Sequence, residues 1–372
     1  MKSVETIVVG AGVIGMMSAW QLAKAGQQVL LIDANDLGQQ ASRCAAGMIG
    51  AQLEVAEPGP FFTLCKESRA MFPDLAEELR SLTGIDIELD RHGILWLSTS
   101  EKEKTALLER QAWQDVQGAS STWLPQDEVC QREPFLRHQQ GALHMHEDTQ
   151  VRATAMVAAL SQVVRQTCQV VLGEAVTSLS PQTGGVMVTT QRAVYHAARV
   201  VIANGAYAKP LLQAVGITYD VFPVKGQACL LAPVSPRTLK HTVYHDHGYL
   251  VPKRDGTILV GATANLDAGF QTTITVNETA TLLSKAQQLL PALADAVVLD
   301  VWAGLRPGNA VGHPLIGATD ATSRVIVATG HYRNGLLLAP ITASIVTTIA
   351  TEQPLPARWS FLDPCAYEVV PS

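Results

Sequence analysis

The sequence predicts a two-domain α/β protein in which one domain is assembled from three separate stretches of the chain. Three observations lead to this prediction. The chain opens with a strand, a glycine-rich turn, a helix and a second strand; its middle carries short apolar runs divided by turn signals; and the residues after 301 return to strand–helix alternation. At 372 residues the chain is also longer than one ordinary core requires.

The N-terminal unit places a glycine-rich turn between a strand and a helix. Residues 5–9 predict the strand, a helical pattern continues to Lys24, Gly26 is placed to end it, and residues 28–32 predict a second strand. A strand, turn and helix of this kind, with glycines in the pattern G-x-G-x-x-G, is typical of a Rossmann-type unit that binds a dinucleotide.

Each glycine of that turn has a separate expected role. Gly10 permits the tight turn, Gly12 lets a pyrophosphate approach the backbone, and Gly15 allows the helix to pack closely on the strand. The N-terminus of the helix would then face the phosphate charge. Asp33, at the end of the second strand, is placed to accept hydrogen bonds from ribose hydroxyls.

A small-residue loop and a helix follow this unit. Residues 38–50 are irregular and rich in small side chains, which is typical of a loop whose backbone approaches a ligand. Residues 61–83 predict one helix, and Gly84 is placed to end it.

The middle of the chain favours an antiparallel sheet. Five apolar runs predict strands, and Asp255-Gly256 between the last two predicts a hairpin. Two amphipathic helices are expected to lie against that sheet, at residues 101–116 and 279–290. The predicted strands are residues 92–98, 141–146, 227–232, 242–252 and 257–264.

Two other stretches repeat the α/β pattern of the N-terminus. Residues 151–164 predict a helix and residues 198–202 a buried strand; residues 325–328 predict another strand, followed by a glycine turn and a helix from about Asn334. We therefore predict a discontinuous dinucleotide-binding domain of residues 1–84, 147–220 and 301–372. The antiparallel, substrate-binding domain is predicted at residues 85–146 and 221–300.

The C-terminal turn bears on which dinucleotide is bound. Residues 329–335 form a second strand–glycine–helix connection, far along the chain from the first. A domain that binds a nicotinamide dinucleotide rarely uses a second connection of this kind near the C-terminus. A flavin does, because its isoalloxazine lies far from its adenosine, and a helix N-terminus near its pyrimidine edge stabilises the anionic reduced ring. The pattern favours FAD, and a plain C-terminal βα unit is the alternative on spacing alone.

Composition excludes several partners. The chain carries 27 Lys and Arg against 33 Asp and Glu, a net charge of −6, without any basic block, so neither nucleic acid nor an anionic membrane is expected as a partner. Its six cysteines form no Cys-x-x-Cys pair, which indicates reduced thiols. Residues 7–20 resemble a signal peptide only loosely, and residues 336–350 contain Pro340 and are short for a spanning helix, so a cytoplasmic protein is expected.

Arg306 is a candidate substrate-binding residue from its setting alone. It lies in an apolar stretch, residues 302–308, that is expected to end in a rigid turn at Pro307. A buried guanidinium needs an anion, and a substrate carboxylate matches its paired donors; an internal Asp or Glu is the alternative partner. Tyr249, on a predicted hairpin strand, is placed to add a second bond to the carboxylate, or is only a packed core residue.

Two His-x-His pairs, His144 with His146 and His245 with His247, raise the question of a metal, because alternate strand residues share a face. Neither pair has a carboxylate or cysteine at a familiar ligand spacing, so no metal site is predicted. We expect polar surface residues, with His247 a candidate for the surroundings of the active site.

Four segments resemble those of the bacterial glycine oxidases of thiamine synthesis, which belong to the D-amino-acid oxidase group of flavoproteins. They are residues 45–48, 244–252, 302–308 and 330–335, and the similarity runs from the first strand to about Ala350. By this resemblance, Arg306, Tyr249 and Arg333 face the substrate. Together with the glycine turn, it gives these expected FAD contacts: Gly10, Gly12, Val13, Ile14, Gly15, Asp33, Ser42, Ala46, Gly47, Met48, Val176, His331, Tyr332, Arg333, Asn334, Gly335, Leu336 and Leu337.

The resemblance implies FAD-dependent oxidative deamination of glycine and other small amines or D-amino acids. Arg306 would anchor the carboxylate while the Cα hydrogen leaves as hydride to the flavin. The products would be an imino acid that hydrolyses to a keto acid (glyoxylate from glycine), ammonia, and hydrogen peroxide from O2. A role in supplying the glycine imine for the thiazole of thiamine is also implied.

Two details of the site follow from comparison with related flavoproteins. Related sarcosine oxidases link their flavin to a C-terminal cysteine, and residues 304–335 contain none, so non-covalent FAD is expected. At Ala264 the family carries a larger methionine, so a roomier substrate pocket is expected.

Three other functions remain open. A D-amino-acid dehydrogenase would use the same pocket and pass electrons to a quinone or carrier. A related flavin domain acts in tRNA modification but needs a basic face that this composition does not show. A dinucleotide-binding sensor without turnover is the non-enzymatic option. Assembly into homo-oligomers is also left open.

Overall fold

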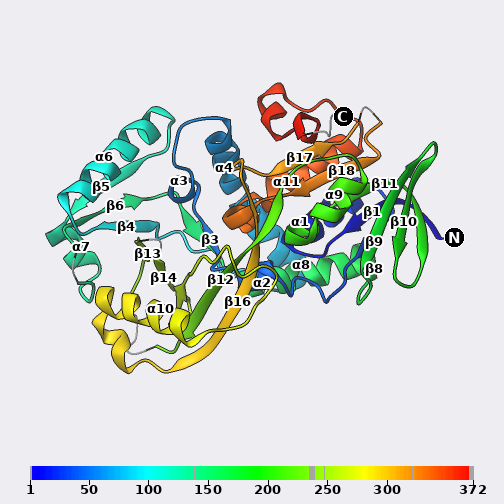
Figure 1. The fold of residues 1–372 in the computed structure, drawn as a ribbon. Coiled ribbons are helices and arrows are strands. Elements are labelled where there is room, and N and C mark those ends of the chain that lie inside the picture. The colour runs from blue at the N-terminus through cyan, green and yellow to red at the C-terminus, as the bar shows by residue number, and fades with distance from the viewer. Residues whose placement is uncertain (1, 138, 234–238, 247, 321, 368–372) are drawn as a thin grey trace.

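The computed structural model describes all residues except 1, 138, 234–238, 247, 321 and 368–372. Most of its strands belong to two eight-stranded sheets, which lie toward opposite ends of an elongated molecule (Figure 1). The N-terminus lies at the outer end of the first sheet.

The first sheet is of the Rossmann type. It consists of β1 (Lys2–Val9), β2 (Val29–Ile32), β8 (Gln169–Val171), β9 (Val176–Gln182), β10 (Gly185–Thr190), β11 (Val194–Ile202), β17 (Leu315–Ala318) and β18 (Val325–Thr329). The main path runs β17-β18-β11-β1-β2-β8, with β1 parallel to both β11 and β2, and β10 and β9 extend from β11 as an antiparallel ribbon. All four residues of β2 are buried and apolar, as expected for a strand covered on both faces.

Helices cover both faces of this sheet. On one face lie α1 (Val13–Lys24), α8 (Ala153–Thr167) and α11 (Gly335–Ala350), whose apolar residues share a core with Val8, Leu31 and Ile326. On the other face, α9 (Lys209–Ala214) packs with the ribbon. The stretch Tyr332–Ala350 is apolar and long enough to cross a membrane by length and composition, but 72% of its apolar window is buried inside the protein. It contacts α1 and α4 (Pro60–Ala70) and is therefore a core helix.

The second sheet has the order β16 (Val298–Asn309), β12 (Val221–Leu231), β15 (Ile258–Gly261), β14 (Gly248–Pro252), β13 (Thr242–His245), β4 (Ile94–Ser98), β6 (Gly141–Met145) and β5 (Ser121–Pro125). Its pairs are antiparallel apart from β13 and β4, which are parallel. The helices α6 (Glu101–Val116), α7 (Gln126–Arg132) and α10 (Val276–Leu289) pack on it. The long strands β12 and β16 run side by side from this sheet toward the first (Figure 1).

The α/β class, the Rossmann unit, α6 and the hairpin across Asp255-Gly256 are confirmed, while some single elements were predicted wrongly. Residues 61–83 form two helices, α4 and α5 (Phe72–Thr83), because Pro73 suits only the first turn of a new helix. Residues 242–252 form the hairpin β13–β14 in place of one strand. The expected loop at residues 38–50 contains α2 (Ala41–Cys44) and β3 (Met48–Ile49).

The rigid turn expected at Pro307 is also absent, since β16 continues to Asn309. Because β16 is an edge strand, the missing N–H of a proline need not disrupt a second ladder. The strands β12 and β16 of the second sheet begin at Val221 and Val298. The domain limits themselves stay a prediction.

Candidate active site

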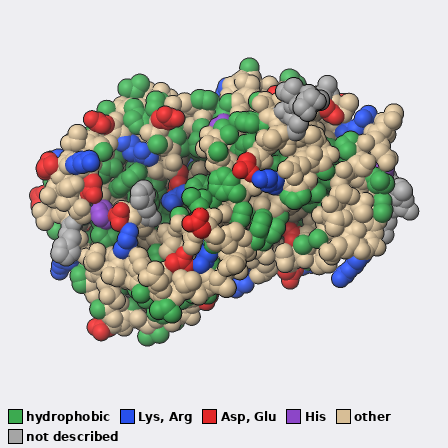
Figure 2. All heavy atoms as spheres, in the orientation of Figure 1, with side chains coloured by type: hydrophobic (Ala, Val, Ile, Leu, Met, Phe, Trp, Pro, Cys, Tyr) green, Lys and Arg blue, Asp and Glu red, His purple; other side chains and the backbone are tan. Residues whose placement is uncertain are grey.

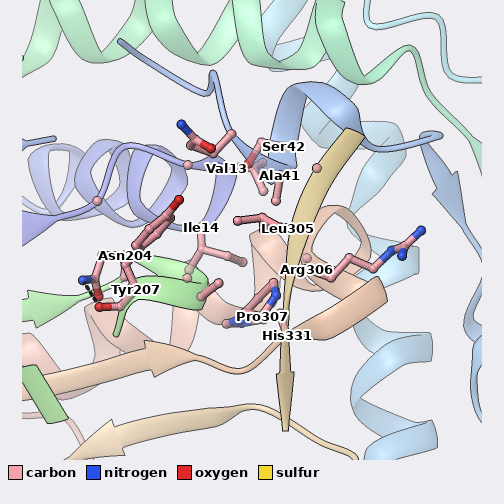
Figure 3. A pocket seen from close by; sticks show the side chains of 18 of the residues that line it. Val13, Ile14, Ala41, Ser42, Asn204, Tyr207, Leu305, Arg306, Pro307 and His331 are labelled. Atoms are coloured by element: carbon pink, nitrogen blue, oxygen red, sulfur yellow. Dashed lines mark hydrogen bonds between the residues drawn. The ribbon is translucent and has the colours of Figure 1, made fainter. Parts of the chain in front are cut away.

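A cavity of about 520 Å³ lies where the two sheets approach each other. Its walls come from the glycine-rich turn, the loop around α2, the connection between β8 and β9, the residues after β11, the inner face of β12 and β16, and the N-terminus of α11. Arg306 lies toward one end of this cavity and Tyr207 with Asn204 toward the other (Figure 3). A space of this size and mixed lining is typical of a small-molecule or cofactor site.

The glycine-rich turn forms the floor of one end. Gly10 has a φ of +102°, and a Cβ there would lie 2.6 Å from the Ala203 carbonyl oxygen, so only glycine fits. A Cβ on Gly15 would lie 1.8 Å from the Gly10 oxygen, which explains the close packing of α1 on the turn. Gly12 lines the cavity, and a Cβ added there would have one near neighbour, the Ser42 Oγ at 3.3 Å.

Asp33 lies beside this turn and fixes it. One carboxylate oxygen accepts the Ala11 N–H at 2.5 Å and the other accepts the Asn35 N–H at 2.7 Å. Burial raises the pKa of Asp33, while these two backbone bonds lower it. A partly buried carboxylate at the cavity wall favours a ligand that donates hydrogen bonds, such as a ribose diol.

The loop around α2 is held between the two sheets by contacts to its backbone. The Trp302 Nε1 donates to the Cys44 oxygen at 3.0 Å, and the Lys253 Nζ donates to the Ala46 oxygen at 2.8 Å. Gly47 has a φ of +90°, and a Cβ there would lie 1.9 Å from the Val151 oxygen. The backbone from Ala45 to Met48 therefore reaches the cavity wall in a fixed position.

The N-terminus of α11 and the residues just before it form another wall of the cavity. His331 is buried, its Nε2 lies 3.0 Å from the Thr342 Oγ1, and burial lowers its pKa to about 3. Its imidazole is therefore neutral at neutral pH. The positive potential on this wall comes from the helix terminus near Gly335 and from neighbouring arginines.

Arg306 presents part of its guanidinium to the cavity. It lies on β16, is half-buried, and donates from Nη1 to the Thr263 oxygen at 3.0 Å. Tyr249 on β14 is buried, and burial raises the pKa of its phenol although Arg306 and Arg333 lower it. The phenol therefore stays protonated and can donate a hydrogen bond beside Arg306.

Arg333 has a carboxylate partner within the protein. Its Nε and Nη2 donate to the two oxygens of Glu54 at 2.8 and 2.9 Å. Both side chains are largely buried, at 20% and 11% exposure, and the carboxylate holds the pKa of Arg333 above its usual value. The paired geometry uses one edge of the guanidinium, so Arg333 is largely neutralised whereas Arg306 is not.

Glu54 is held in place from both ends of the short helix α3 (Ala51–Glu54). The buried Asp148 accepts the N–H groups of Gln52 and Leu53 at 2.9–3.1 Å. At the other end, Arg110 donates to the oxygens of Leu53 and Val55 at 2.9 and 2.7 Å. These contacts cap a helix too short to be stable alone and fix the direction of Glu54.

The FAD dependent oxidoreductase family (DAO) matches residues 5–349 of this chain. The chain belongs to that family. Among its relatives, a glycine oxidase of Bacillus licheniformis is 34% identical over 96% of this chain and 96% of its own length. A bifunctional protein ThiO/ThiG of Synechocystis sp. is 33% identical over 94% of this chain and 52% of its own. The crystal structure of a glycine oxidase from Geobacillus kaustophilus superposes with a TM-score of 0.94 at 32% identity, covering 98% of each chain.

As a member of this family, the protein is an FAD-dependent oxidoreductase, and the residues of its cavity suit FAD. The Gly10 and Gly12 backbone leaves open the space that a pyrophosphate needs at the start of α1. Asn204 adds a buried Oδ1 at the cavity wall, for which the described residues provide no hydrogen-bond partner. Among the described residues, no group of three or more His, Cys, Asp or Glu is arranged to hold a metal ion.

The structure brings most of the predicted site residues together around the cavity. Arg306, Tyr249 and Arg333 all line it, and so do most of the expected FAD contacts. Gly15, Asn334 and Leu337 do not line it; Gly15 acts by packing on Gly10. Ala264 is likewise not a lining residue, so the prediction of a roomier pocket gains no support. The predicted contacts that line the cavity are Gly10, Gly12, Val13, Ile14, Asp33, Ser42, Ala46, Gly47, Met48, Val176, His331, Tyr332, Arg333, Gly335 and Leu336.

Sequence reasoning missed several lining residues, of which Glu54 matters most. An acidic residue next to the small-residue loop was a usable signal, but its partner Arg333 is 279 positions away. Tyr207, which stacks on Phe270 with ring centroids 4.8 Å apart, was also missed. The histidines of the first pair lie on β6 and its end, where His144 packs against His146 and His241 outside the cavity. His247 lies outside the described residues.

Proposed function

We propose that this enzyme oxidises glycine and other small primary or secondary amines that carry one carboxylate, including small D-amino acids. The observation that carries the proposal is the charge at the substrate end of the cavity. Arg306 and Arg333 contribute two positive charges and Glu54 one negative charge, which leaves one guanidinium to be matched by one carboxylate.

Arg306 anchors that carboxylate in this proposal. Arg306 lines the cavity and donates one N–H to Thr263, and its guanidinium interacts with the Tyr249 hydroxyl, which also lines the cavity and can donate to the same carboxylate. Fixing the carboxylate at these two residues orients the Cα of the substrate, and orientation of this kind supplies a large share of a rate enhancement. Arg333, held by Glu54, shapes the same wall and adds little charge.

FAD bound in this cavity would supply the oxidising power as a two-electron acceptor, and in this proposal O2 would take up the two electrons and become hydrogen peroxide. The substrate leaves as an imine, which water hydrolyses to a keto acid and ammonia; glycine gives glyoxylate. Because the Cα hydrogen would leave as a hydride, no base among the described side chains has to remove it as a proton; the amine reacts in its neutral form, whose lone pair forms the C=N bond of the imine.

The relatives support the glycine assignment, because proteins named glycine oxidase match this chain over nearly its whole length. The relative named ThiO/ThiG supports a role in thiamine synthesis, where the glycine imine would be used. Acidic and basic side chains are interspersed on the face shown in Figure 2, which agrees with a small-molecule substrate. We place the enzyme in the cytoplasm.

A substrate panel tests the proposal. The purified protein is mixed without oxygen with glycine, sarcosine, D-alanine and D-proline, and the loss of the yellow flavin absorbance is followed. Peroxide is then measured in air. We expect bleaching by glycine and peroxide in proportion to substrate consumed. Bleaching without peroxide or oxygen uptake would favour the dehydrogenase, and no bleaching by any of the four would contradict the proposal.

A further inference from the structure

The face of the second sheet that is directed toward the cavity carries several glycines, which leave space above the backbone. On β12, Gly226 pairs with Gly304 of β16, and two positions further along Ala228 pairs with Gly261 of β15. Gly261 in turn pairs with Tyr249 of β14. Residues that pair across strands point to the same face, so these small residues form one shallow depression.

The guanidinium of Arg306 lies in this depression, directly over Gly226. A Cβ on Gly226 would lie 2.2 Å from Nη1, 2.4 Å from Cζ and 2.4 Å from Nη2 of Arg306. Non-bonded carbon atoms need about 3.5 Å, so an alanine here and this arginine conformer cannot coexist. The φ of Gly226 is outside the left-handed region, so the backbone itself accepts any residue.

The ring of Tyr249 lies over Gly261 in the same way. A Cβ on Gly261 would lie 2.4 Å from Cε2 and 2.6 Å from both Cζ and the hydroxyl oxygen of Tyr249. The third glycine, Gly304, receives the loop around α2, since its Cβ would lie 2.7 Å from the Cβ of Cys44. A glycine inside a strand weakens it, and such glycines mark places where another group approaches closely.

We propose that Gly226 and Gly261 are positioning residues that set the location of the carboxylate site. They let Arg306 and Tyr249 lie flat against the sheet, so that their donors converge at one point and the space between them and the flavin side of the cavity stays open. A Cβ at either glycine raises the side chain above it into that space. This inference rests on the proposed role of Arg306 as carboxylate anchor.

A double-mutant cycle tests the role of Gly226. Acetate, a carboxylate that cannot be oxidised as an amine, is titrated into the FAD-loaded protein, and its Kd is read from the flavin absorbance. Gly226→Ala should weaken acetate binding by about tenfold to a hundredfold in the Arg306 background, because charge-assisted bonds are lost. In the Arg306→Ala background the same change should alter Kd by less than about twofold, since no guanidinium remains to be displaced.

Gly261→Ala should weaken acetate binding by about twofold to tenfold, because Tyr249 supplies one hydrogen bond. Gly248→Ala is the matched control on β14: its Cβ would meet the Gly261 oxygen at 3.4 Å and the His245 oxygen at 3.5 Å, which are ordinary contacts. Its acetate Kd should equal that of the wild type. FAD content and thermal melting of each variant separate displaced side chains from general damage.

Equal losses from Gly226→Ala in both Arg306 backgrounds would overturn the inference, because the glycine would then act only on the fold. Unchanged acetate binding in Gly226→Ala, or a wild-type protein that binds no acetate, would overturn it as well. The titration needs no turnover. Failure of glycine oxidation, seen in the substrate panel, is therefore distinguishable from failure of this inference.

Discussion

Replacing Glu54 with glutamine should change both the stability of the protein and the ligand charge that the cavity prefers. Glutamine has nearly the same shape and still offers one oxygen to Arg333, but the negative charge and one of the two bonds, at 2.8 and 2.9 Å, are lost. Removing one partner of a fully buried ion pair costs about 3–5 kcal/mol. Arg333 keeps 20% exposure and one acceptor, so we expect a smaller loss, about 1–3 kcal/mol.

The same substitution raises the charge at this end of the cavity from one to two. A second carboxylate on the ligand would then find Arg333 unpaired, and a charge-assisted bond is worth about 1.5–3 kcal/mol, or tenfold to a hundredfold in Kd. We therefore expect Glu54→Gln to bind malonate more tightly relative to acetate by at least tenfold.

The assay is a pair of titrations followed by flavin absorbance, with thermal melting of the FAD-loaded protein beside it. Glu57→Gln is the control, because Glu57 is exposed and changes the net charge equally. An unchanged ratio of malonate to acetate Kd in Glu54→Gln would refute the reasoning that Glu54 neutralises Arg333. A melting temperature equal to that of the wild type would show that the pair adds no stability.

Four other results are expected. Arg306→Ala should raise the Michaelis constant for glycine by about tenfold to a hundredfold with FAD retained, and Arg306→Lys should rescue it only in part; an unchanged constant would make Arg306 structural. Acid precipitation should release all of the yellow colour into the supernatant, since residues 304–335 lack a cysteine, and colour in the pellet would contradict this. Phe270→Ala should speed FAD release by roughly twofold to tenfold through loss of the aromatic stack, whereas the exposed Leu266→Ala should not; equal rates in both would rule the stack out. Burial lowers the pKa of His144 to about 4, below its unfolded value near 6.5, so the unfolded state binds more protons between these two values. The free energy of unfolding of the wild type should therefore decrease as the pH is lowered from 6.5 to 4. A difference in melting temperature between the wild type and His144→Gln that is equal at pH 7 and pH 4.5 would contradict this.

The parts of the fold that the sequence predicted are those whose physical cause is local. Gly10 is needed within its own turn, since its φ is +102°, and the same reasoning identified Gly84, which ends α5 in the left-handed conformation. Asp255-Gly256 predicted the β14–β15 hairpin because the turn depends on its own residues: Gly256 has a φ of +85°, and its N–H donates to the Lys253 oxygen at 2.9 Å. The break between α4 and α5 was also readable, because Pro73 marks the first turn of a helix.

The arrangement of the substrate end depends on pairings that are far apart in the chain. Arg306 was identified as a buried cation in need of an anion, and Glu54 was the kind of internal partner that this argument allows. The structure assigns Glu54 to Arg333, 279 positions away, and leaves Arg306 facing the cavity. Composition and spacing along the chain carry no information about such a choice, because it is made by the register of β16 on β12 and by the anchoring of α3.

The glycines of the second sheet illustrate the same limit more sharply. A glycine in a turn is recognisable because its φ excludes other residues, as at Gly47 with +90°. Gly226 has a backbone that any residue could adopt, and along the chain it is a small residue between Lys225 and Gln227 in a buried strand. Its purpose appears only when Arg306 is placed opposite Val224, which brings the guanidinium over the next residue on that face. The requirement for glycine is then imposed by a side chain 80 positions away, so a substitution harmless to the backbone should still displace the guanidinium that we propose as the carboxylate anchor.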